Sequence, residues 1–128
     1  MKQTLNKHAD TFYAVFRIIV GLLFFQHGLQ KIFGMLGGNA ATAFSLMWFA
    51  GIIELVGGAF IALGLFTRIV AIIASVEMLV AFFRSHVPQG WVPIMNKGEL
   101  ALLFFAAFLV LMTRGAGKWS LGRKLFKK

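Results

Sequence analysis

The sequence has no cysteine among its 128 residues, and this absence excludes several kinds of chemistry at once. Without thiols the chain cannot form a disulfide, supply a thiolate nucleophile, ligate an iron–sulfur cluster or carry a CxxC redox relay. If the protein takes part in redox chemistry, a cofactor or a partner must therefore carry the electrons.

Acidic residues and prolines are also scarce, with four Asp and Glu residues against thirteen Lys and Arg residues, and only two prolines. The net charge of +9 could indicate nucleic-acid binding. The basic residues, however, gather at the ends of apolar segments and in the C-terminal tail, as they do in membrane proteins that follow the positive-inside rule. We therefore expect no nucleic-acid partner.

Apolar residues are abundant, at 59% of the chain, and fifteen Phe residues stand against one Tyr. A soluble domain of this length cannot bury so much apolar surface, so the expected environment is a lipid bilayer. The apolar runs predict an all-α polytopic membrane protein, an antiparallel four-helix transmembrane bundle in a single domain over residues 1–128. The expected spans cover about 11–33, 44–66, 68–87 and 97–114, and a basic tail follows over 115–128.

Four spans place both termini on one side of the membrane. Most of the Lys and Arg residues lie on that side, whereas the opposite side holds Lys31, Arg84 and Lys97. This asymmetry predicts that both termini are cytoplasmic. The first apolar run lacks a small-residue cleavage site, so we expect it to be retained as the first helix.

Ionisable residues within the expected spans are the candidates for a functional site, because an intramembrane charge costs about 3 kcal/mol on insertion scales and needs a partner or a polar cavity. Glu54 shares a helix face with Gly51 and Gly58, so it is expected to point into the bundle. Glu77 lies at a similar depth on the next span. The candidates for an outward-facing polar pocket that could exchange protons are His27, Lys31, Glu54, Glu77, Arg84, His86 and Glu99.

A structural interpretation of the same charges stays open, in which they form ion pairs that fix the helix register. Arg17 could pair with Glu77 or Glu54. Lys31 could pair with Glu99, and Arg68 is a further candidate for an intramembrane ion pair.

Other residue patterns bear on packing and on bound metals. The glycines expected at helix-packing positions are Gly21, Gly28, Gly51, Gly57, Gly58 and Gly64. No metal or haem is expected, because His27 and His86 belong to different segments and no HxxxH or ExxH pair is present.

The order of these residues resembles the DoxX family of small bacterial membrane proteins over nearly the whole chain. The likeness rests on an ordered set: Arg17, Gly21, His27-Gly28-x-x-Lys31, Glu54 with Gly57-Gly58, Gly64-x-x-Thr67-Arg68, and Gly115-x-Gly117-x-Trp119-Ser120-Leu121. The sequence departs from the family at Gly122, where members often have an acidic residue. The resemblance implies that Arg17, His27, Lys31, Glu54 and Arg68 matter.

The resemblance also implies a bacterial inner-membrane location and a link to redox chemistry. The family takes its name from a membrane subunit associated with thiosulfate oxidation and a quinone acceptor, and other members are associated with quinone, catechol or oxidative stress. We therefore expect a quinone-linked redox protein, or a subunit of a membrane redox or oxidative-stress complex. Lys31, His27 and Arg84 would contact the ligand and Glu54 or Glu77 would exchange a proton.

Two other functions stay open at the level of sequence. The protein could be a non-catalytic scaffold or assembly partner for another membrane or membrane-associated enzyme. It could also be a small oligomeric transporter, because four short helices would need a homo-oligomer to form a pathway. Whether it is an enzyme, and which cofactor it holds, the sequence does not decide; quinone is the candidate.

Overall fold

The computed structural model describes residues 1–126 and consists of helices joined by loops, of which the longest covers residues 34–45. The elements are α1 (Lys2–Lys7), α2 (Ala9–Phe33), α3 (Leu46–Leu63), α4 (Thr67–Ala81), the π-helix η1 (Phe82–His86), the 3-10 helix η2 (Val87–Gln89), α5 (Pro93–Asn96), α6 (Glu99–Arg114) and α7 (Leu121–Phe126). The predicted all-α class is thereby confirmed. The last two residues of the predicted basic tail, 127 and 128, lie outside the described residues.

Within the described chain, three helical segments are long and apolar enough to cross a bilayer: α2, α3 and Thr67–Gln89, in which η1 and η2 continue α4. This confirms a polytopic helical membrane protein, and the predicted spans 11–33, 44–66 and 68–87 agree with these segments to within a few residues. Helix α6 has 16 residues, so it is about 24 Å long. That length is less than a hydrocarbon core of about 30 Å, and its assignment as a fourth span stays a prediction.

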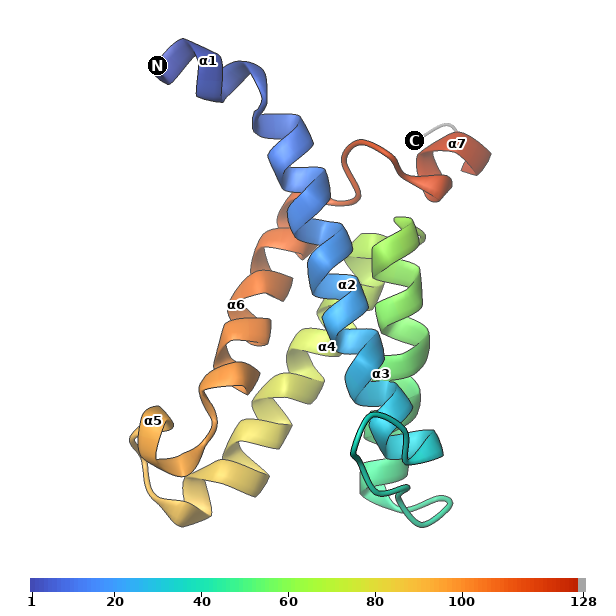
Figure 1. Cartoon of the computed structure of the whole chain (residues 1–128), viewed down its shortest axis with the longest axis vertical. Helices are drawn as coiled ribbons and strands as arrows, with labels where there is room; N and C mark the ends of the chain where they lie inside the picture. Colours follow the sequence, from blue (N-terminus) through green and yellow to red (C-terminus); the bar gives the residue numbers. More distant parts are fainter. Residues whose placement is uncertain (127–128) are drawn as a thin grey trace.

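The helices form two pairs, α2 with α3 and α4 with α6 (Figure 1). The pairs lie close together at the end that carries α1 and α7, which we call the terminus end. They diverge toward the end that carries the α2–α3 loop and α5, which we call the loop end (Figure 1). The divergence separates α3 from α4 along part of their length.

Glycines bring α2 and α3 into contact at the level of the backbone. A Cβ atom added to Gly28 would lie 2.3 Å from the backbone nitrogen of Leu55, and one added to Gly58 would lie 2.4 Å from that of Phe25. Helices without a large hydrophobic driving force between them associate through such close approaches of small residues. The glycines of this contact are Gly21, Gly28, Gly51 and Gly58.

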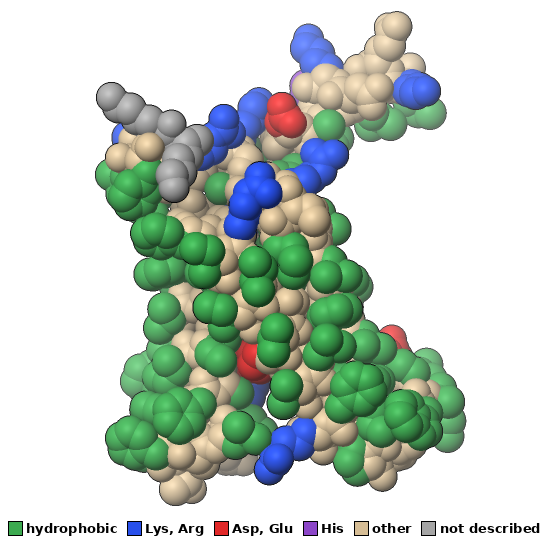
Figure 2. All heavy atoms as spheres, turned by 180° about the vertical axis from the view of Figure 1, so that it is seen from behind, with side chains coloured by type: hydrophobic (Ala, Val, Ile, Leu, Met, Phe, Trp, Pro, Cys, Tyr) green, Lys and Arg blue, Asp and Glu red, His purple; other side chains and the backbone are tan. Residues whose placement is uncertain are grey.

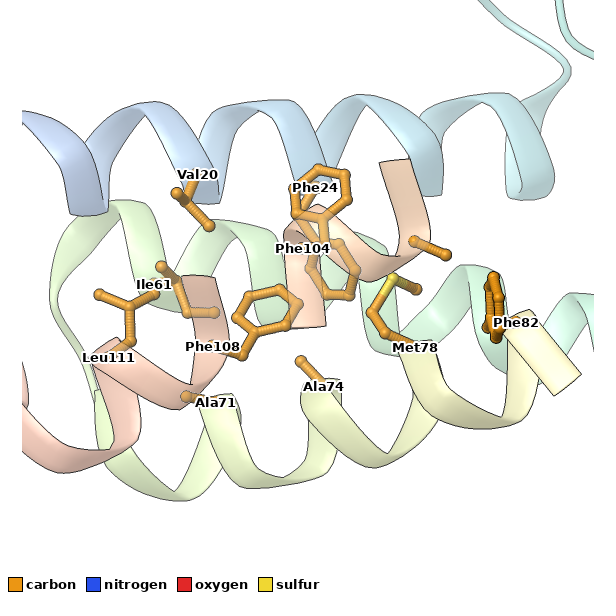
Figure 3. Packing of buried hydrophobic residues seen from close by; sticks show 11 residues of the cluster. Val20, Phe24, Ile61, Ala71, Ala74, Met78, Phe82, Phe104, Phe108 and Leu111 are labelled. Carbon is orange, nitrogen blue, oxygen red and sulfur yellow. The ribbon is translucent and has the colours of Figure 1, made fainter. Parts of the chain in front are cut away.

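An aromatic cluster joins the two pairs (Figure 3). The ring of Phe24 on α2 lies 5.4 Å from that of Phe104 and 4.8 Å from that of Phe108, both on α6. Small residues face this cluster from α4, where Ala71 and Ala74 are fully buried. The cluster holds the pairs together on the terminus side and leaves them apart beyond it.

Two adjacent glycines of α3 provide a matched test of the α2–α3 contact. Gly58→Ala should lower the free energy of unfolding by about 2 kcal/mol or more, because the new methyl group meets the backbone of α2. Gly57→Ala should stay within about 1 kcal/mol of wild type, since its Cβ would meet side chains alone, a movable Val70 methyl group at 3.3 Å and the Phe24 ring at an ordinary contact distance of 3.6 Å. Unfolding in detergent micelles measures both, and equal values would contradict the contact.

Candidate functional site

A cavity of about 1060 Å3 lies between the two helix pairs at the loop end. Its walls are mostly apolar, and α2, α3, α4, η1 and α6 all contribute to them. Figure 2 shows acidic and basic atoms deep in the hollow between the pairs, on a face otherwise covered by apolar side chains. The charged and histidine residues that line the cavity are His27, Lys31, Glu54, Glu77, Arg84, His86 and Lys97.

A buried ion pair closes the inner part of the cavity. The Nζ of Lys31 donates a hydrogen bond of 2.6 Å to Oε1 of Glu54, whose side chain is only 2% exposed. The contact requires glycine at position 51, because a Cβ there would lie only 2.8 Å from the Cβ of Lys31. The expected pairing of Lys31 with Glu99 was therefore wrong: the close approach of α2 and α3 brings Lys31 to Glu54.

Glu77 faces this ion pair from α4. Its carboxyl group interacts with that of Glu54 through a side-chain hydrogen bond and by charge, and it interacts with Lys31 by charge alone. Its Oε1 atom is buried and has no hydrogen-bond partner among the described residues. An unpartnered polar atom in an apolar interior costs free energy. The Glu77 side chain also lines the cavity, so a small rotation of its carboxyl group would let this oxygen meet a ligand there.

His27 completes the inner group from one turn earlier on α2. It is half-buried, it stands edge-on to the ring of Phe104 with centroids 5.8 Å apart, and it interacts electrostatically with Lys31 and Glu54. We call His27, Lys31, Glu54 and Glu77 the inner polar group. Its members come from three helices and converge on one region of the cavity, although no single helix shows a recognisable motif.

The mouth of the cavity is formed by η1 and by the loop before α6. Arg84 and His86 lie in η1, and Nδ1 of His86 lies 3.0 Å from the backbone oxygen of Asn96. The Asn96 side chain is fully buried, donates to the oxygen of Gly90 at 2.8 Å and accepts from the nitrogen of Gly98 at 2.8 Å. Asn96 was not predicted from the sequence. Its position two residues before Gly98 could have indicated it, because Asn side chains often bond the nearby backbone in turns.

Glu99 was expected in the pocket and is not part of it. It is exposed in the first turn of α6 and lines a separate surface depression with Pro93 and apolar residues of α6. Its carboxylate at a helix N-terminus is favourable without any partner in the bundle. Over the described residues, no group of three or more His, Cys, Asp or Glu side chains is arranged to hold a metal ion.

Arg17 does not form the expected ion pair with Glu77 or Glu54. Its guanidinium is fully buried at the terminus end, where it donates to backbone carbonyl oxygens. These acceptors are Ile61 at 3.0 Å, Ala62 at 3.4 Å, Lys118 at 2.8 Å, Trp119 at 3.0 Å, and Ala116. The acceptors belong to the last turn of α3 and to the tail, so Arg17 joins these two segments to α2.

Arg68 and Gly64 have similar roles. Arg68 donates to the oxygens of Thr113 at 2.6 Å and Met112 at 3.3 Å, which are carbonyls at the end of α6. Gly64 was expected at a helix-packing position, but it ends α3 with a φ of 73°, and Ser120 donates to its oxygen at 2.7 Å. Arg68 and Ser120 thus donate to carbonyl oxygens at helix ends, which have no partner within their own helix. They hold the terminus end closed and lie outside the cavity.

A double-variant cycle tests the buried ion pair. Lys31→Met should lower the free energy of unfolding by about 3–5 kcal/mol, because it leaves the Glu54 carboxylate buried without its partner. Adding Glu54→Gln should recover a large part of that loss. Unfolding in detergent measures all variants, and a double variant as unstable as the sum of the two single variants would contradict the pairing.

Comparisons with known proteins agree with this architecture. The DoxX family model matches residues 12–87. The chain is 44% identical to an uncharacterized protein of Haemophilus influenzae, covering 97% of this chain and 98% of the relative. It is 30% identical to an uncharacterized membrane protein of Mycobacterium tuberculosis, with 88% and 80% covered, and 28% identical to a Bacillus subtilis protein named "Putative oxidoreductase CatD", with 96% and 93% covered. No solved structure matches the chain significantly. The chain belongs to the DoxX family.

Proposed function

We propose that this protein binds a quinone-type ring in its cavity and acts as a quinone-linked membrane protein or as the membrane subunit of a redox or oxidative-stress complex. The observation that carries the proposal is the unpartnered oxygen of Glu77, which faces the Lys31–Glu54 pair inside an apolar cavity. A flat apolar ring with oxygen substituents fits both features, because the walls accept the ring and the inner polar group accepts its oxygens.

The inner polar group offers complementary hydrogen-bonding roles. Lys31 can donate to a ring carbonyl while it remains bound to Glu54, and Glu77 can accept from a ring hydroxyl or donate to a carbonyl when it is protonated. A quinone takes up two electrons and two protons on reduction to a hydroquinone. In this proposal Glu77 and His27, which both line the cavity, exchange the protons.

The chain itself contributes no thiol for the electron transfer. In this proposal the electrons come from a partner redox enzyme in or at the membrane, and the present residues bind the ring and move protons. The Bacillus subtilis relative bears an oxidoreductase name, which supports a redox role here. A homo-oligomer stays a further prediction for the assembled state.

The orientation of the cavity follows from the same proposal. With α6 as a fourth span in a bacterial inner membrane, the basic terminus end faces the cytoplasm under the positive-inside rule. Figure 2 shows Lys and Arg side chains gathered at that end. The loop end and the mouth of the cavity then lie in the outer leaflet, and ligand and protons exchange there.

Replacement of Glu77 separates binding from stability. Glu77→Leu should weaken the binding of decylubiquinone by roughly tenfold or more, since it removes a hydrogen bond to a group that can be charged. The same variant should stay within about 1 kcal/mol of the wild-type stability, because the loss of the interaction with Glu54 is offset by removal of a buried oxygen without a partner. Titration of the purified protein in detergent measures the binding.

The matched control is Glu99→Leu, which removes the same group from the exposed start of α6. It should leave quinone binding within about twofold of wild type, an affinity change that corresponds to less than 1 kcal/mol. Equal binding by the wild type and Glu77→Leu, or equal loss in both variants, would refute the proposed site.

A further inference from the structure

The mouth of the cavity carries two cations that the inner polar group does not use. Arg84 on η1 and Lys97 before α6 both line the cavity and are both exposed. Neither has an ion-pair partner in the described part of the chain, where Lys31–Glu54 is the pair that forms. Glu99 follows Lys97 by two positions but lines a different depression. The mouth is therefore positively charged.

Between this mouth and the inner polar group, the cavity is open on the side that lies between α3 and α4. Apolar residues of α3 and α4 line the cavity and are nevertheless about half exposed, such as Phe49 at 49%, Ile73 at 49% and Val76 at 56%. In a membrane helix such surface contacts hydrocarbon chains. The cavity is thus open to lipid between α3 and α4, at the place where the helix pairs diverge (Figure 1).

The two polar levels lie at different depths. Arg84 follows Glu77 by seven positions along a continuous helical segment, which corresponds to roughly 10 Å along the axis. A basic group at the end of a span lies in the headgroup region, where it attracts anionic lipid. The mouth therefore lies at headgroup level, while the inner polar group lies at the level of the acyl chains.

We propose that Arg84 and Lys97 form a binding site for the phosphate of an anionic membrane lipid, whose acyl chain lies in the opening between α3 and α4. The two cations are complementary to a negatively charged headgroup. The exposed apolar wall favours a molecule that carries an acyl chain over free phosphate. Guanidinium and ammonium groups are both phosphate ligands. The site uses residues outside the inner polar group, so it stands whether or not a quinone binds there.

Native mass spectrometry of the full-length protein tests this site with phosphatidylglycerol and phosphatidylcholine of identical chains. Wild type should prefer phosphatidylglycerol by roughly 10- to 30-fold, because each of the two basic residues should raise the affinity for an anionic lipid by roughly fivefold. Arg84→Gln with Lys97→Gln should reduce the preference to about threefold or less. Arg84→Lys, which keeps the charge, should retain most of it.

The matched control removes two lysines from the terminus end, Lys2→Gln with Lys7→Gln in α1, outside the cavity. It should keep the wild-type preference. An unchanged preference in the Arg84 and Lys97 double variant, or an equal loss in the control, would overturn the proposal. Displacement of phosphatidylglycerol by millimolar inorganic phosphate would also overturn it, because the site would then recognise the free anion.

Loss of lipid preference is distinguishable from loss of quinone binding. Glu77→Leu should retain the preference for phosphatidylglycerol, since Glu77 lies at the inner level. Lys97→Gln alone should weaken that preference and retain decylubiquinone binding, since Lys97 lies outside the inner polar group. If Glu77→Leu lost as much of the lipid preference as the double variant does, the lipid site and the inner polar group would not be separate sites.

Discussion

The backbone contact between α2 and α3 is the constraint on which the rest of the structure depends. Glycines on both helices leave no room for side chains at the interface, and Gly51 lies against the stem of Lys31. That proximity brings the Lys31 ammonium to the buried Glu54 carboxylate, so each charge compensates the other in an apolar environment. With α2 and α3 joined so closely, the second pair, α4 and α6, can diverge from them and leave a cavity.

The two ends of the molecule use their polar residues in different ways. At the terminus end, Arg17 and Arg68 donate to backbone carbonyls that the helices leave unsatisfied, and this joins the tail to α2 and α3. At the loop end, polar residues line the cavity, and one buried carboxyl oxygen of Glu77 is without a partner in the described chain. Satisfied polar groups stabilise a fold, whereas an unsatisfied one in a cavity is a point of binding. The terminus end also holds one buried oxygen without a partner among the described residues, Oγ1 of Thr67, so what distinguishes Glu77 is that it lines the cavity.

Periodicity and hydropathy were sufficient to predict the helical membrane class and the bounds of three spans, because long apolar runs have few alternative structures. The direction of the Glu54 side chain, into the bundle, could also be predicted, because Glu54 shares a helix face with Gly51 and Gly58. Partner choice could not be predicted, because it depends on how helices meet in space: Lys31 pairs with Glu54 across a glycine contact, and Arg17 binds a tail about a hundred positions away. Asn96 was missed because its hydrogen bonds are made within a loop that lacks a periodic pattern.

In the function proposed above, the cavity between the helix pairs receives a quinone-type ring at Glu77. The most direct measurement is photolabelling of the detergent-purified protein with an azido-quinone, followed by mass spectrometry of the labelled peptides, with and without excess unlabelled quinone. The account predicts labelling of the cavity-lining parts of α2, α3 and α4 around His27, Ile53 and Val76, suppressed by competitor and lost in Glu77→Leu. Labelling spread over the lipid-facing surface, insensitive to competitor and unchanged in the variant, would contradict it.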